Sequence, residues 1–62
     1  MRIFINYTLA NIHGEVVSNE LTIFFDVRTF SDYHELFYNH IQKHHQRHWV
    51  KINLVKVVDL PN

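Results

Sequence analysis

Residues 2–27 decide the fold, and they read RIFINYTLANIHGEVVSNELTIFFDV. Apolar and polar side chains alternate over residues 2–10 and again over residues 17–27, which is typical of two half-buried β-strands. Between the strands, Asn11 and Gly14 occupy the first and fourth positions of a type I turn. We therefore predict a β-hairpin with a three-residue loop in which Gly14 has a positive φ.

The loop length also predicts the register of the hairpin. If Asn11 closes the loop against Glu15, the apolar residues of the two strands fall opposite one another on one face. The predicted pairs are Leu9 with Val17, Ile5 with Leu21, and Ile3 with Ile23. A two-residue loop would slip one strand by one residue and place the two apolar sets on opposite faces. The sequence therefore favours the longer loop.

A helix follows the hairpin. Thr29 and Asp32 match a capping box, which predicts that the helix starts at Phe30 and runs to about His48. Acidic residues in its first turns and basic residues in its last turns complement the helix dipole. Side chains on its predicted apolar face are Phe30, Tyr33, Leu36, Phe37 and Ile41. Neither Gly nor Pro marks where the helix ends.

Residues 49–58 alternate once more and predict a third strand, with a bulge or an edge at residues 55–58, where the alternation breaks. The resulting ββαβ order predicts one α+β domain over residues 1–62. In it, a single helix covers one face of a three-stranded, mainly antiparallel sheet. We favour the strand order 2-1-3, in which the third strand pairs with the first. A parallel third strand beside the second is the alternative.

Composition excludes several classes of protein. The 62 residues carry six Lys and Arg against six Asp and Glu, so the net charge is zero and a polybasic coat is excluded. The absence of Cys excludes disulfides and thiolate metal sites. The chain starts with Met and has neither a signal peptide nor a long apolar segment. We therefore expect a complete, cytoplasmic chain without a membrane partner.

One helix can cover only one face of the sheet, and large apolar groups on the other face favour a protein interface. The residues predicted for this face are Phe4, Thr22, Phe24, Trp49 and Val55. We expect a binding module that acts as a homodimer or in complex with a larger protein, through this face or a strand edge. No nucleophile motif, Gly-rich phosphate loop or His-Glu-x-x-His sequence indicates an enzyme.

The charge is divided along the chain, and this division favours a second hypothesis. Residues 1–39 hold two Arg against five acidic residues, whereas residues 40–62 hold four basic residues against Asp59. Trp49 lies within the basic segment, as on a surface that stacks nucleic-acid bases. The alternative function is therefore nucleic-acid binding, for which the predicted residues are Lys43, Arg47, Trp49, Lys51 and Lys56.

Histidines recur every four residues at His40, His44 and His48. Two His four apart on a helix can share a Zn²⁺ ion, which would need a third ligand such as His13 or Asp59. A structural role, in which the rings cover the edge of the core and complement the helix dipole, is the favoured interpretation. No other cofactor is predicted.

Overall fold

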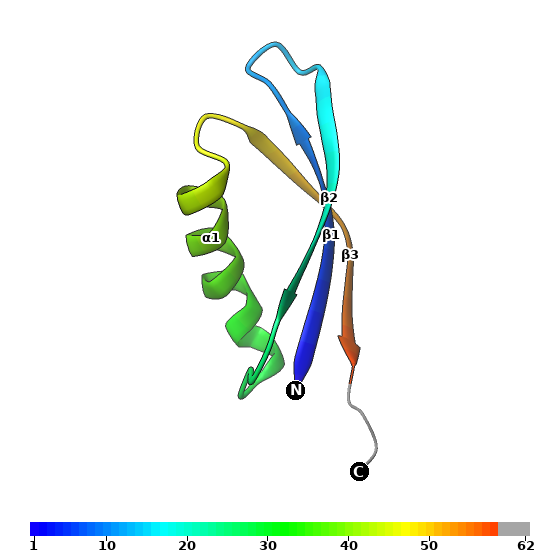
Figure 1. Cartoon of the computed structure of the whole chain (residues 1–62), viewed down its shortest axis with the longest axis vertical. Coiled ribbons are helices and arrows are strands. Elements are labelled where there is room, and N and C mark those ends of the chain that lie inside the picture. Colours follow the sequence, from blue (N-terminus) through cyan, green and yellow to red (C-terminus); the bar gives the residue numbers. More distant parts are fainter. Residues whose placement is uncertain (59–62) are drawn as a thin grey trace.

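β1 (Arg2–Ala10) lies between β2 (Val16–Phe24) and β3 (Trp49–Val58), and both neighbours run antiparallel to it. A 3-10 turn, η1 (Phe30–Asp32), leads into the helix α1 (Tyr33–His44), which covers one face of the sheet (Figure 1). The structure is a computed structural model that describes residues 1–58. The predicted α+β class, ββαβ order and strand order 2-1-3 are confirmed, and the parallel alternative is wrong.

The core lies between α1 and one face of β1. Apolar alternation directs every second side chain of β1 toward the helix, and these side chains are fully buried: Ile3, Ile5, Tyr7 and Leu9. Val27 and Phe37 complete the buried cluster. Tyr33 and Ile41 pack against it, which confirms the predicted apolar face of the helix over Tyr33, Phe37 and Ile41. Phe30 and Leu36 remain exposed at its margin.

The hairpin loop has the predicted length. The backbone N–H of Asn11 donates to the Glu15 carbonyl at 2.9 Å, and the N–H of Gly14 donates to the Asn11 carbonyl at 3.0 Å. Gly14 has a φ of 81°, as predicted. The Asn11 side-chain oxygen accepts from the backbone N–H groups of His13 and Glu15, at 2.9 and 3.0 Å, so Asn11 holds both sides of the turn.

Beyond the loop, the predicted register is wrong because β2 contains a β-bulge. Ala10 pairs with Val16, but Leu9 pairs with Ser18, so Val17 is an extra residue in β2. A one-residue shift moves all later side chains to the other face of the sheet. The observed pairs are Leu9 with Ser18, Ile5 with Thr22, and Ile3 with Phe24. β2 also ends at Phe24, three residues before its predicted end.

The helical segment begins at Phe30 as predicted, with the 3-10 turn η1, and α1 ends early. The Asp32 carboxylate accepts from the backbone N–H of Thr29 at 3.2 Å, which is one half of the expected capping box. The helix ends at His44 rather than near His48, because His45 leaves the helical conformation with a φ of −136°. Arg47 then turns the chain toward β3 with a φ of 70°. No helix within residues 1–58 is long and apolar enough to cross a membrane.

β3 contains a second bulge, at Asn53 rather than at the predicted residues 55–58. Tyr7 pairs with Ile52 and Asn6 pairs with Leu54, which leaves Asn53 between them. Before the bulge the even-numbered residues of β3 face the helix, and after it the odd-numbered residues do. The helix-facing positions of β3 are therefore Val50, Ile52, Val55 and Val57. The prediction placed the interruption two residues too late because the change of phase becomes visible only at Val55.

We expect the substitution Gly14→Val to lower the free energy of unfolding by about 1 kcal/mol or more, because an L side chain is strained at positive φ. A Cβ at position 14 would meet no atom within 4 Å, so the cost comes from the backbone alone. Urea unfolding of both proteins measures the effect. Gly14→Asn is the matched control, and its free energy of unfolding should fall by less, since Asn tolerates a positive φ. Equal stability of the Val variant and the native protein would contradict the loop assignment.

Candidate functional site

The sheet face turned away from α1, hereafter the open face, carries a group of apolar side chains from all three strands. Its large apolar members are Phe4, Leu21, Ile23, Trp49 and Leu54. Leu21 and Leu54 lie on either side of Asn6 and are 61% and 57% exposed, and Trp49 is 67% exposed. Side chains of this size, gathered on one exposed surface, are typical of an interaction site.

A row of polar side chains crosses the open face between these apolar groups. The Asn6 amide donates to the Asn19 side-chain oxygen at 2.6 Å, which joins β1 to β2. The Asn53 amide donates to the Asn6 oxygen at 3.2 Å and to the Thr8 hydroxyl at 2.8 Å, which joins β3 to β1. The row thus fixes the side-chain positions on this face and ties the bulge at Asn53 to the central strand.

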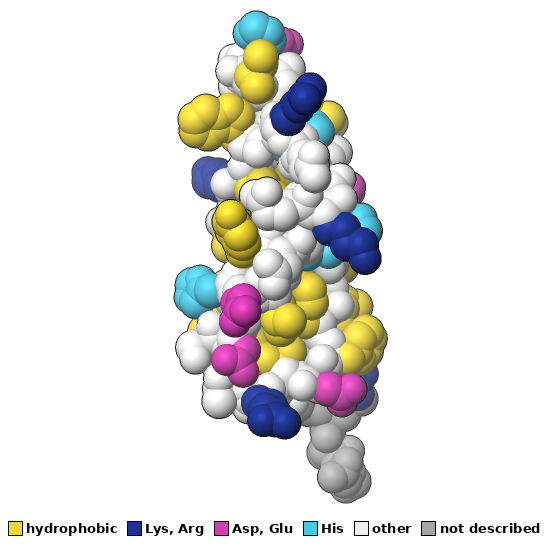
Figure 2. Space-filling model, turned by 90° about the vertical axis from the view of Figure 1, so that its left-hand side faces the viewer, with side chains coloured by type: hydrophobic (Ala, Val, Ile, Leu, Met, Phe, Trp, Pro, Cys, Tyr) yellow, Lys and Arg dark blue, Asp and Glu magenta, His cyan; other side chains and the backbone are white. Residues whose placement is uncertain are grey.

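The open face is cationic. Arg2, Lys51 and Lys56 occupy its strand positions, and none of the open-face positions in β1, β2 and β3 carries a carboxylate. Glu20 lies on the helix-facing side of β2, opposite Tyr7. Viewed from the helix side, other acidic side chains gather around an apolar patch near one end of the molecule (Figure 2). The two sides of the molecule therefore differ in charge.

Three of the five residues predicted for the open face lie on the other side of the sheet. Phe4 and Trp49 lie on the open face. Thr22 and Phe24 lie on the helix-facing side, because the bulge at Val17 exchanges the two faces of β2. Val55 also lies on the helix-facing side, because the bulge at Asn53 exchanges the two faces of β3 from Leu54 onward. Phe24 packs against the core and its ring contacts that of His40, with centroids 5.9 Å apart. The large apolar residues of the open face that the sequence interpretation did not place there are Leu21, Ile23 and Leu54.

The five residues of the nucleic-acid hypothesis do not share one face. Trp49, Lys51 and Lys56 lie on the open face. Lys43 is in the last turn of α1, which covers the other side of the sheet, and Arg47 is in the turn between α1 and β3. The structure adds Arg2 to the three residues on the open face.

Histidines at the end of α1 surround the hydroxyl of Tyr7. The Tyr7 oxygen lies 2.9 Å from Nε2 of His45 and 3.3 Å from Nε2 of His40. A phenol hydroxyl can donate to one ring and accept from the other. Because Tyr7 is otherwise buried in the apolar core, these two rings satisfy the only polar group on its side chain. The His44 ring lies beside that of His40, with centroids 4.7 Å apart and ring planes tilted by 47°.

Burial and like charges shift the ionisation of this cluster. Desolvation lowers the pKa of His40, and the neighbouring His44 and His45 lower it further. Desolvation also raises the pKa of Tyr7, with a further contribution from the Glu20 carboxylate. The folded state therefore favours a neutral His40 beside a neutral Tyr7.

The three predicted metal ligands do not form one site, although His44 lies beside His40. Among residues 1–58, no group of three or more His, Cys, Asp or Glu is placed to hold a metal ion. His48 lies beyond the end of α1, and its Nδ1 hydrogen-bonds instead with the Gln46 carbonyl at 3.2 Å. His13 is exposed in the hairpin loop, and Asp59 lies outside the described residues. The cluster around Tyr7 supports the structural interpretation of the histidines.

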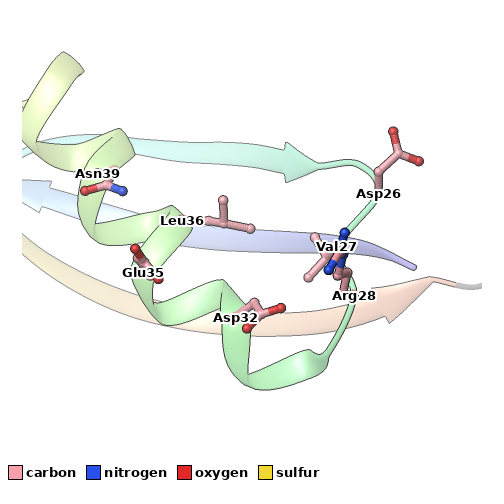
Figure 3. Close-up of a pocket in the computed structure, with 7 residues that line it drawn as sticks. All are labelled: Asp26, Val27, Arg28, Asp32, Glu35, Leu36 and Asn39. Atoms are coloured by element: carbon pink, nitrogen blue, oxygen red, sulfur yellow. The ribbon is translucent and has the colours of Figure 1, made fainter.

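A shallow hollow of about 390 Å³ lies at the other end of the helix, between its first turns and the loop after β2 (Figure 3). Leu36 points from α1 toward the loop that carries Val27, whereas the Asp26 side chain points away from the helix. The remaining lining residues are Arg28, Asp32, Glu35 and Asn39. Within residues 1–58, the polar groups that line the hollow are carboxylates, one guanidinium and one amide.

The chain matches no protein-family model, no curated protein and no solved structure. The geometry of the open face is therefore the strongest indication of function.

We expect the melting temperature to fall between about pH 7.5 and about pH 5.5, with His40 making the largest single contribution. Because the pKa of His40 is lower in the folded chain than its ordinary value of 6.5, the unfolded chain binds the proton first as the pH falls. Its stabilising contribution is complete above pH 6.5 and is lost as the pH falls toward the folded pKa.

The variant His40→Gln should show a smaller fall in melting temperature over this range than the native protein. His13→Gln is the matched control, because His13 is exposed in the hairpin loop and has no hydrogen bond to the cluster around Tyr7. Thermal unfolding followed by circular dichroism at several pH values measures both. An equal fall in the two variants would show that His40 does not carry the effect.

Proposed function

We propose that this protein is a non-catalytic module that binds another protein through the open face of its sheet. The observation that carries the proposal is the exposure of Leu21, Trp49 and Leu54 on a sheet face that no element of the described chain covers. Burying such side chains against a partner removes apolar surface from water, which is the main driving force of protein association.

The small core supports the same conclusion. Within residues 1–58 only six side chains are buried, and four of them belong to β1. β2 directs Leu21 and Ile23 away from the helix although β1 offers an apolar neighbour on the helix side. A small domain that leaves these residues outside its own core gains stability when a partner covers them.

Charge indicates the kind of partner. The cations Arg2, Lys51 and Lys56 accompany the apolar group, without a carboxylate on the open face. A partner with an apolar patch bordered by Asp and Glu would complement this surface and would associate faster at low salt.

Nucleic-acid binding is the second candidate, and the same face supports it. Phe4 and Trp49 could stack on bases while Lys51 and Lys56 contact phosphates, as in other open sheets that bind single strands. Leu21, Ile23 and Leu54 favour the protein partner, because branched aliphatic side chains neither stack on bases nor bind phosphate.

We expect a photo-crosslinking amino acid at Leu54 to capture a defined protein in the cells that produce this chain, and one at Tyr38 to capture none. Tyr38 is the matched control because it is 63% exposed on α1, on the other side of the molecule. The captured protein is then purified and titrated against the native chain and against Leu54→Asp. Its affinity for the variant should be at least about tenfold weaker, as for a residue in the centre of an interface.

Equal capture at both positions, or an unchanged affinity of Leu54→Asp, would contradict the protein-binding proposal. Fluorescence anisotropy with single-stranded DNA and RNA oligonucleotides tests the second candidate. Binding that weakens steeply with salt, and that Lys51→Glu with Lys56→Glu abolishes, would favour nucleic acid as the ligand.

A further inference from the structure

The two outer edges of the sheet differ in their protection against pairing with another strand. β3 carries Lys51 and Lys56 and is interrupted by the bulge at Asn53, and both features hinder further strand pairing. β2 pairs regularly with β1 from Ser18 to Phe24, and its only charged residue is Glu20. It contains neither Pro nor a basic residue. The free edge of β2 is therefore the less protected one.

We propose that β2 pairs with β2 of a second copy of this chain, antiparallel, so that two three-stranded sheets form one six-stranded sheet. The two-fold axis passes near Leu21 and is perpendicular to the sheet. This operation keeps the open faces of both copies on the same side and joins them into one wider surface. The inference concerns the edge of β2 alone, so it does not depend on the partner proposed for the open face.

The side chains of β2 suit this pairing. With Leu21 opposite Leu21 of the second copy, Thr22 lies opposite Glu20 of that copy, and Ile23 lies opposite its Asn19. No like charges face one another in this register, and the two exposed Leu21 side chains contact across the axis. A shift that sets Glu20 opposite Glu20 is disfavoured by charge repulsion.

Charge and symmetry exclude other ways for two copies to associate. Packing the open faces against each other would bring together Arg2, Lys51 and Lys56 of both copies without an intervening carboxylate. If β2 paired with β3 of another copy, the bulge at Asn53 would interrupt the hydrogen bonds between the two strands. Each added copy would also leave one free edge at either end, so the molecules would form open chains rather than a closed dimer. The β2 pair, by contrast, is two-fold symmetric and closes after two copies.

Disulfide trapping tests the pairing directly, because the native chain contains no Cys. Residues opposite each other in an antiparallel pair have Cα atoms about 4.5–5.5 Å apart, which a disulfide can span. We expect Leu21→Cys to form a covalent dimer under mild oxidation. Leu54→Cys is the matched control, because Leu54 is similarly exposed and equally distant from β1 but lies on the β3 side.

Sedimentation velocity of the native protein complements the trapping. The short interface predicts weak association, so the concentration should range from about 5 µM to about 500 µM. The mass should rise from 7.6 kDa toward twice that value. Leu21→Lys should weaken the dimer at least about tenfold, whereas Leu54→Lys should leave it unchanged.

A mass of 7.6 kDa at every concentration, or equal disulfide formation at positions 21 and 54, would overturn the inference. The inference would also be overturned if Leu54→Lys weakened the dimer as strongly as Leu21→Lys, because that result would place the contact on the open face. Capture of a partner through Leu54 without trapping at Leu21 would uphold the proposed function and reject the β2 pair. Disulfide trapping at Leu21 without capture of a partner at Leu54 would uphold the β2 pair and reject the proposed function.

Discussion

The register between β1 and β2 depends on Val17, the one residue of β2 that has no partner in β1. Because side chains alternate between the faces of a sheet, this single residue decides where every later side chain of β2 points. It directs Ser18, Glu20 and Thr22 toward the helix and Leu21 and Ile23 away from it. Without the bulge, β2 would add its aliphatic side chains to the core, and the open face would be mostly polar. The contribution of β2 to the apolar group on the open face is therefore a consequence of one inserted residue.

The reversal of β2 also brings a carboxylate to the helix side of the sheet, near the polar cluster at the end of α1. Glu20 faces the helix side opposite Tyr7, and its carboxylate favours the protonated form of the Tyr7 hydroxyl. That hydroxyl lies at the end of a buried ring and needs hydrogen-bond partners, which His40 and His45 provide. His45 reaches it from the first residue beyond the helix, so this contact and the early end of α1 belong to the same arrangement. The helix length is thus tied to a tyrosine on the central strand.

The sequence predicts the elements and topology well, because each depends on local patterns. The alternation of β1 and the position of Gly14 are sufficient for the first strand and the hairpin loop, and the Thr29–Asp32 spacing is sufficient for the helix start. The bulges are not predictable in this way. At Val17 the alternation itself is regular, and only the non-local gain from placing Phe24 against the core distinguishes the two registers. The predicted interface was therefore correct for Phe4 and Trp49 in its orientation and wrong for Thr22, Phe24 and Val55.

The two bulges have different effects on the side chains that follow them in their strands. At Asn53 the bulge keeps the valines of β3 directed toward the helix, and the freed side chain joins the polar row with Asn6. At Val17 the bulge removes Leu21 and Ile23 from the core. The first bulge thus directs Val55 and Val57 toward the helix, whereas the second directs Phe24 toward the helix and two aliphatic side chains away from it. Under the proposed function, a partner that covers the open face would bury these aliphatic side chains in an interface, and this burial would offset their removal from the core.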